Sequence, residues 1–436
     1  MTLARHTLTK TLAAAALAFV AALAVLMLVN RSSTPARSSA DSAPGAGSLV
    51  GASTDTRIRS FQALVRAHPR DSRGYGFLGD AYLQKVRETG DASFYTRAGA
   101  VYRRALALDR RDPAATVGMG TLALARHDFR GGLDYGLRAH ALAPDVVKPL
   151  GVIVDAYVEL GRYRQAGDTL QRMVDLKPNL SSYARVSYFR ELHGDLAGAI
   201  AAMRLAVSAG GDAPENVAYV QTLLGNLLFE TGRLGPAREA YRLALARFPR
   251  YVPAGAGLAR VEAAGGDLPA AIRRYRSAVA RLPLPEYVVG LGEAELAAGR
   301  HAQARRDLAL VRAEEQLLRA NGVNTDVDLA LFEASHGSTA RAVVLARRAW
   351  AQAPSVRSAD ALGWGYTRAG RPDAGLRWAK RSLRLGSRDP MLLFHAGMAA
   401  KGAGRGGTAR SYLARALELN PRFNPLYAPQ AQEALR

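Results

Sequence analysis

The sequence predicts an all-α fold in which one helical hairpin is repeated about ten times. Similar segments follow one another at a period of about 34 residues from residue 55 onward. A glycine turn recurs in phase with this period, and a proline closes many copies, where its missing N–H group ends a helix. Because each copy packs against its neighbours, we expect one continuous core rather than separate globular domains.

The clearest copy, residues 218–250, shows how the hairpin is built. Small and aromatic residues stand where two short helices must touch, on either side of a turn at Gly232 and Arg233. In order, these residues are Leu224, Gly225, Leu228, Ala237, Tyr241, Ala244 and Pro249. Their spacing resembles the signature of the tetratricopeptide repeat. The resemblance implies a right-handed α-solenoid of about ten tetratricopeptide helical hairpins, with first helices lining a concave groove and second helices forming the convex back.

The other copies keep the same register. The turn between the two helices recurs at Gly161, Gly194, Gly232, Gly266, Gly299, Gly337, Gly370 and Gly404, each followed by Arg, Asp or Ser. Closing prolines stand at Pro144, Pro178, Pro249, Pro283, Pro354 and Pro421. Eight turns in phase exclude a chance pattern, so hairpins are predicted throughout residues 55–422.

The two ends of the array depart from the repeat. In the first unit, Tyr102 stands seven residues later than the register of Tyr82 predicts. Such an insertion adds two helical turns and leaves the apolar face in place. Residues 58–69 indicate a lone second helix before the first unit, and residues 423–435 indicate a polar-faced helix that caps the open end.

An apolar run at residues 12–29 precedes the repeats. Its 18 residues are near the minimum that spans a bilayer and exceed a typical signal-peptide core. We predict an N-terminal hydrophobic helix within residues 1–30, either a signal anchor that contacts the membrane through residues 11–29 or a cleaved signal peptide. Residues 31–54, rich in Ser, Ala, Pro and Gly, are typical of a flexible linker. The repeats and the cap at 423–436 are then expected outside the cytoplasm, anchored at the cell membrane or secreted.

The net charge of +22 comes from 53 Arg, 6 Lys and 37 acidic residues. Arg in such excess over Lys, with abundant Ala and Gly, is typical of a GC-rich bacterial genome. The predicted first helices from Pro113 onward hold eight basic and twelve acidic residues, which predicts a neutral-to-acidic groove and a basic back. A nucleic-acid ligand in the groove is therefore disfavoured. The basic back either keeps the array soluble or faces an anionic surface.

Eight side chains at groove-facing repeat positions are candidates for binding a partner. They are Asp155, Tyr188, Tyr219, Asn226, Arg260, Glu293, Trp364 and Phe394. Exposed aromatic residues in a groove anchor peptides, although some of these side chains could pack on the neighbouring repeat instead. Family resemblance also implies a peptide-carboxylate clamp, but Asn226 has no matching Lys, so this clamp is not predicted.

The sequence carries no motif for catalysis, a cofactor or a metal. It has no cysteine, and it lacks the H-E-x-x-H, G-x-S-x-G and phosphate-loop patterns. We predict a non-enzymatic, membrane-tethered and extracytoplasmic scaffold that binds a partner protein or peptide in its groove. Two alternatives remain open: a cell-wall or glycan-associated factor, and a regulatory scaffold that faces the cytoplasm.

Overall fold

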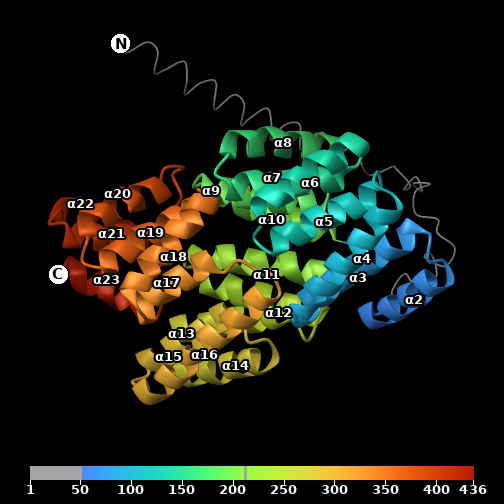
Figure 1. Ribbon diagram of the computed structural model, residues 1–436. Coiled ribbons are helices and arrows are strands. Elements are labelled where there is room, and N and C mark those ends of the chain that lie inside the picture. Colours follow the sequence, from blue (N-terminus) through green and yellow to red (C-terminus); the bar gives the residue numbers. More distant parts are fainter. Residues whose placement is uncertain (1–51, 211–213) are drawn as a thin grey trace, which may run out of the picture. The chain divides into compact units, whose positions relative to one another are not determined.

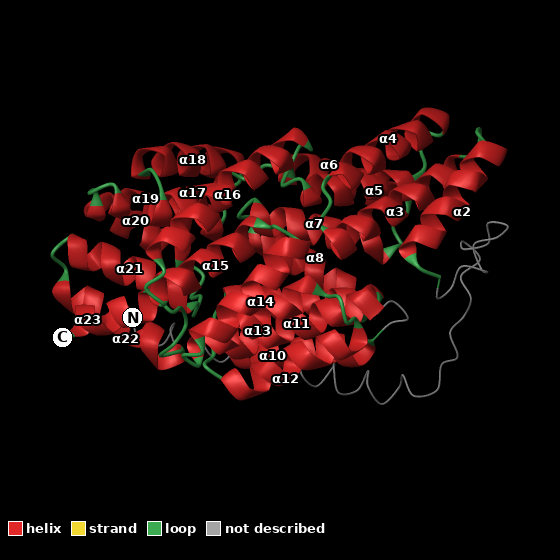
Figure 2. Ribbon diagram, turned by 90° about the horizontal axis from the view of Figure 1, so that it is seen from below, coloured by secondary structure: helices red, strands yellow, loops and turns green. Residues whose placement is uncertain are grey.

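The computed structural model describes residues 52–210 and 214–436, and within these ranges it contains 22 α-helices and no strand (Figures 1 and 2). A single helix, α2 (Thr54–Ala67), is followed by ten antiparallel pairs and by α23 (Tyr427–Leu435). The pairs are α3 (Ser72–Thr89) with α4 (Ser93–Leu108), α5 (Pro113–Ala125) with α6 (Phe129–Leu142), α7 (Val147–Glu159) with α8 (Tyr163–Leu176), α9 (Leu180–Leu192) with α10 (Leu196–Ala209), α11 (Pro214–Glu230) with α12 (Leu234–Arg247), α13 (Val252–Ala264) with α14 (Leu268–Arg281), α15 (Pro285–Ala297) with α16 (His301–Ala320), α17 (Asp326–His336) with α18 (Thr339–Gln352), α19 (Val356–Arg368) with α20 (Pro372–Ser382), and α21 (Pro390–Gly402) with α22 (Gly406–Leu419). The predicted ten hairpins are confirmed.

The predicted glycine turns lie between the helices of their pairs. Seven of the eight glycines adopt the left-handed conformation, with φ between 69° and 88°, which only glycine adopts without strain. Where Asp follows the glycine, its carboxylate caps the next helix: Asp195 accepts from the Gly198 N–H at 2.8 Å. Gly337 is the exception, with φ of −138°, because there the Glu333 carboxylate accepts from the Ser338 N–H at 2.7 Å and holds the turn differently.

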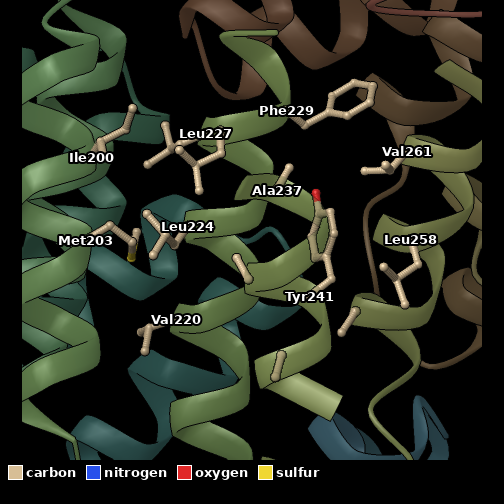
Figure 3. Close-up of a cluster of buried hydrophobic side chains, with 14 of the residues drawn as sticks. Ile200, Met203, Val220, Leu224, Leu227, Phe229, Ala237, Tyr241, Leu258 and Val261 are labelled. Carbon is tan, nitrogen blue, oxygen red and sulfur yellow. The ribbon is translucent and has the colours of Figure 1, made fainter. Parts of the chain in front are cut away.

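The clearest repeat packs around Tyr241, which is fully buried between α11, α12 and α13 (Figure 3). A Cβ atom at Gly225 or at Gly257 would lie 2.5 or 2.3 Å from the Tyr241 ring, so the ring fills the space that two glycines leave. Leu224, Leu258 and their neighbours complete this apolar cluster. The spacing of small and aromatic residues in the sequence is therefore the spacing of the contacts between helices.

Two helices accommodate the extra residues of the first unit. α3 has 18 residues and α4 has 16, against 13 or 14 in most other helices of the array. Both helices are longer, so the predicted insertion lengthens the hairpin and does not form a loop. A second long helix, α16, has 20 residues and was not predicted from the sequence.

The C-terminal cap begins later than predicted. α23 starts at Tyr427 rather than at residue 423, because the Asn424 side chain accepts hydrogen bonds from the N–H groups of Leu426 and Tyr427 and forms a turn there. Residues 422–426 therefore precede the helix as a folded segment.

The hairpin turns of the first five pairs contact the loops that follow the last five pairs. The Val356 N–H donates to the Tyr163 hydroxyl at 2.9 Å, and Asn420 Nδ2 donates to the Phe229 carbonyl at 2.7 Å. His127 Nδ1 also contacts the Asn324 carbonyl oxygen. In each of these three contacts, the two residues are 191 to 197 positions apart in the sequence. One superhelical turn of the array therefore packs against the next.

We call this line of contacts the seam. It joins the turns at Gly90, His127, Gly161, Gly194 and Gly232 to the loops at Leu282, Asn324, Pro354, Gly386 and Asn420, respectively. In Figure 1, α9 (green) lies beside α19 and α20 (orange), close to the contact between Gly194 and Gly386.

The predicted N-terminal hydrophobic helix and the linker fall outside the described residues, apart from the last residues before α2. Among the residues that the structure does describe, no helix combines the length and the apolar character needed to cross a membrane.

Candidate functional site: the inner cavity

First helices surround a cavity of about 1180 Å³ on the inner side of the described array. Its walls come mainly from α9, α11, α13, α15, α17, α19 and α21, with contributions from α14, α16 and the segment before α23. The second helices form the outer layer, as the family resemblance implies. Because the seam brings two superhelical turns together, residues from both halves of the array face the same space.

The structure brings five of the eight candidate residues together at this cavity. The five are Tyr188, Tyr219, Asn226, Arg260 and Glu293. Asp155 lies outside the lining and forms an ion pair with Arg185, in which Oδ2 and Nη2 are 2.6 Å apart.

The structure places Trp364 and Phe394 in the core and not in the groove. Their exposed fractions are 3% and 0%, and their ring centroids are 5.9 Å apart. The Trp364 indole N–H donates to the Ser335 hydroxyl at 2.9 Å, so its polar group is satisfied internally. Both aromatic residues pack against neighbouring repeats, which is the alternative that the sequence left open.

Two tyrosines present aromatic surface to the cavity. Tyr188 on α9 is 36% exposed and Tyr219 on α11 is 47% exposed, and both line the cavity. The other large apolar side chains with this exposure in the described chain are aliphatic, and none of them lines the cavity. The exposed aromatic surface is therefore concentrated inside the array.

Polar groups on successive first helices pair across the repeats. Asp328 on α17 forms an ion pair with Arg357 on α19 at 3.1 Å. Asp360 on α19 contacts the His395 imidazole on α21, with both carboxylate oxygens 3.0 Å from Nδ1. The Asp328–Arg357 pair neutralises part of the charge on the inner face, and both contacts tie a hairpin to the next one.

Asn226 and Arg260 form a similar pair. Asn226 Oδ1 accepts from the Tyr241 hydroxyl at 2.7 Å and from Arg260 at 3.4 Å, while the Arg260 guanidinium lies 4.3 Å from the centre of the Phe229 ring. The amide N–H groups of Asn226 donate to no residue that the structure describes, so they remain available to a ligand.

The cavity as a whole is acidic. Three arginines line it, namely Arg260, Arg357 and Arg422. Eight carboxylates line it: Glu191, Glu230, Glu286, Glu293, Glu315, Asp328, Asp360 and Asp389. With neutral histidines, eight negative and three positive groups leave a formal charge of −5 in a protein whose net charge is +22.

Glu191, Glu230 and Asp389 form a group of mutually repelling carboxylates. Burial, followed by repulsion from Asp389, raises the pKa of Glu191 to about 7. Burial also raises the pKa of Glu230 well above its usual value, and repulsion from Glu191 and Asp389 adds to this shift. Asp389 is stabilised in part because it caps α21, accepting from the N–H groups of Met391 and Leu392. Glu191 has no such compensation, and for Glu230 only the positive charge of Arg260 acts to lower the pKa.

These three residues are not among the candidates that the sequence predicted. Glu191 and Glu230 stand at the ends of first helices, just before the glycine turns at Gly194 and Gly232. That shared position was visible in the sequence. The approach of Asp389 depends on the seam, because it comes from the other superhelical turn, and no local pattern encodes that contact.

Other acidic residues that the sequence assigned to the groove lie elsewhere. Glu295 and Glu333 are fully buried, and each binds an arginine of a second helix: Arg276 at 2.6 Å and Arg312 at 2.9 Å. Burial acts to raise the pKa of Glu333, but hydrogen bonds from Arg312 and from the Ser338 N–H hold it below its usual value. The outer arginines therefore pair with buried acids and also carry the basic character of the back.

The part of the chain that the structure describes holds no group of three or more His, Asp or Glu side chains placed to bind a metal ion. The inner face instead offers hydrogen-bonding groups, carboxylates and tyrosine rings, which suit recognition of a ligand.

A family model described as tetratricopeptide repeat matches residues 58–100 and 256–316. No curated protein matches the sequence. Among solved structures, the chain is similar to a thermophilic TPR protein of Thermus thermophilus, with 21% identity over 47% of this chain and 99% of that chain and a TM-score of 0.35. It is similar to YrrB, a TPR protein with an unusual peptide-binding site, with 19% identity over 45% of this chain and 96% of that chain and a TM-score of 0.28. It is also similar to the human IFIT1 dimer with m7Gppp-AAAA, with 16% identity over 84% and 76% and a TM-score of 0.40. The family match over residues 58–100 and 256–316, together with the ten helical hairpins of the described chain, supports a tetratricopeptide repeat architecture.

Proposed function

We propose that this protein is an interaction scaffold that binds a segment of a partner protein in the inner cavity. The observation that carries the proposal is the exposure of Tyr188 and Tyr219 inside a cavity of about 1180 Å³. Exposed aromatic residues in a concave site provide large contact areas with few rotatable bonds, and they dominate the energetics of many interfaces.

Two further features support a peptide as the occupant. The volume exceeds the range of about 300–1000 Å³ that is usual for small-molecule pockets. The free amide donors of Asn226 can bind a carbonyl group of an extended chain, which leaves side chains to be recognised by the surrounding surface.

Photo-cross-linking tests the proposal. A benzophenone amino acid replaces Tyr219 in the cavity and, as a matched control, Val344 on α18, which is 62% exposed on a second helix. We expect the Tyr219 position to capture one partner of defined mass from the native cell and the Val344 position to capture none. Capture from Val344 alone would place the binding surface on the outer layer and overturn the proposal.

The finer part of the proposal is that the scaffold is tethered to a membrane outside the cytoplasm, or secreted. The apolar run at residues 12–29 and the linker-like composition of residues 31–54 support it. Protease added to intact cells is expected to digest the repeats. Digestion that requires lysis of the cells would contradict this location and favour a scaffold that faces the cytoplasm.

A further inference from the structure

We propose that the inner cavity selects a peptide segment rich in lysine or arginine. This inference rests on the proposed function and narrows the class of partner. The charge of the lining, the lack of partners for Glu191 and Glu230, and the exposed tyrosines on the same helices support it.

The lining offers negative charge that its own arginines do not balance. Each of the three arginines is already engaged: Arg357 with Asp328, Arg260 with Asn226 and the Phe229 ring, and Arg422 with the Ala264 carbonyl at 3.5 Å. Adding these three positive charges to the eight carboxylates leaves a formal charge of −5. Of these carboxylates, Glu315 is also paired with Arg319 and Arg341, which lie outside the lining. A cationic ligand complements this surface, whereas an anionic ligand would be repelled.

Glu191 and Glu230 are the carboxylates that a bound cation would stabilise most, because burial and repulsion raise the pKa of each in the free cavity. Neither carboxylate accepts a hydrogen bond or forms an ion pair with any residue that the structure describes. They approach each other and Asp389 closely enough for their charges to repel. A lysine ammonium or an arginine guanidinium placed between them would replace this repulsion with attraction, so the cavity gains most from a ligand that carries positive charge at this place.

The exposed tyrosines extend the same surface. Tyr188 and Glu191 are three residues apart on α9, and Asn226 and Glu230 are four residues apart on α11, with Tyr219 seven residues before Asn226. Residues with these spacings share one face of a helix. Each of the two helices therefore presents a tyrosine and a carboxylate on one side, and a tyrosine face attracts a nearby cation.

A peptide fits this arrangement better than a small polyamine does. A polyamine could satisfy the carboxylates, but it has no carbonyl group to accept from Asn226 and no apolar side chain to cover the tyrosines. The net charge of the whole chain, +22, makes a preference for basic peptides informative. Non-specific attraction at the outer surface favours acidic peptides, so a preference for basic peptides would report on the cavity.

Fluorescence anisotropy with the full-length protein tests the inference. The probes are three labelled decapeptides, in which alanine alternates with lysine, with glutamine or with glutamate, and spermine is the competitor without a peptide backbone. We expect the lysine peptide to bind at least tenfold more tightly than the glutamine peptide at low salt, and this preference to shrink as salt is raised. Spermine is expected to compete only at concentrations far above those of the unlabelled lysine peptide.

Matched variants locate the effect. We expect the double variant Glu191→Gln/Glu230→Gln to lose at least tenfold in affinity for the lysine peptide. Glu239→Gln/Glu418→Gln removes the same charge from exposed positions of α12 and α22, and we expect it to change the affinity less than twofold. Tyr219→Ala, at a half-exposed position of the lining, is expected to weaken binding as well.

The outcomes separate this inference from the proposed function. If the glutamine or glutamate peptide binds as tightly as the lysine peptide and Tyr219→Ala weakens that binding, the cavity binds peptides but the cationic class is wrong. If spermine binds as tightly as the lysine peptide, the peptide part is wrong. If no peptide binds and Tyr219 captures no partner in the cross-linking experiment, the proposed function itself fails.

Discussion

Tyr241 shows how single residues determine the geometry of the repeat. Its ring is fully buried and occupies the space left by Gly225 on its own hairpin and Gly257 on the next one. Its hydroxyl donates to Asn226, which stands on the inner face. One residue therefore connects the packing of the core to the polar groups of the cavity.

The two glycines of α13 give a matched test of this packing. Gly257→Ala would place a methyl group 2.3 Å from the Tyr241 ring, and overpacking of this kind costs about 1–3 kcal/mol. Gly255→Ala, on the same helix, would meet nothing within 4 Å, so it is expected to be neutral or to stabilise by up to about 1 kcal/mol, because alanine restricts the unfolded chain. Thermal unfolding followed by circular dichroism measures both. Equal effects of the two changes would show that Tyr241 does not fill the space at Gly257.

At the scale of helices and turns, the sequence predicted the hairpins well because their contacts are local. The glycine turns, the closing prolines and the small residues at helix contacts all lie within one period, so each copy encodes its own geometry. The late start of α23 depends on the Asn424 side chain, and the length of α16 depends on residues between two regular copies. Neither the start of α23 nor the length of α16 is encoded by the repeating pattern.

The seam could not be predicted from the same pattern. A glycine in a hairpin turn fits the left-handed conformation whether or not another part of the chain packs against it. Gly194 and Gly370 both have positive φ, of 78° and 72°. Only at Gly194 does the structure place another backbone group within contact distance, and that group lies in a distant loop.

These two turns therefore test the seam. Gly370→Ala is expected to cost about 1–2 kcal/mol, from the left-handed backbone alone. Gly194→Ala carries the same backbone strain and would also place a methyl group 2.3 Å from the Gly386 carbonyl oxygen, so its cost is expected to exceed that of Gly370→Ala by about 1–3 kcal/mol. The measurement is the shift in the thermal midpoint of unfolding. Similar shifts for the two variants would argue that the two superhelical turns do not touch at this point.

For the whole molecule, the arrangement of charge matters more than its total. A chain with a net charge of +22 carries a cavity with a formal charge of −5, because carboxylates, six of the eight on first helices, collect inside, while many arginines stand on second helices. The sequence predicted a neutral-to-acidic groove from the repeat register. It did not predict which carboxylates would remain without partners, because the pairs Arg312–Glu333 and Arg276–Glu295 form between a second helix and the next first helix.

The candidate site could be predicted from the sequence as far as the repeat register shows which positions of the first helices face the groove. Five of the eight candidate residues line the cavity, as their groove-facing positions on first helices predicted. Trp364 and Phe394 stand at similar positions but are large enough to fill the contact with the neighbouring repeat, and both are buried there. Asp389 joins the site only because the seam brings the second superhelical turn against the first.

The central claim is that the partner binds inside the array and not on its outer layer. Photo-cross-linking from paired positions tests it most directly: Tyr188 and Tyr219 in the cavity against Leu243 and Val344 on second helices, which are 51% and 62% exposed. We predict that both cavity positions capture the same partner and that both outer positions capture none. Capture of that partner from Leu243 or Val344, with none from Tyr188 or Tyr219, would contradict the claim.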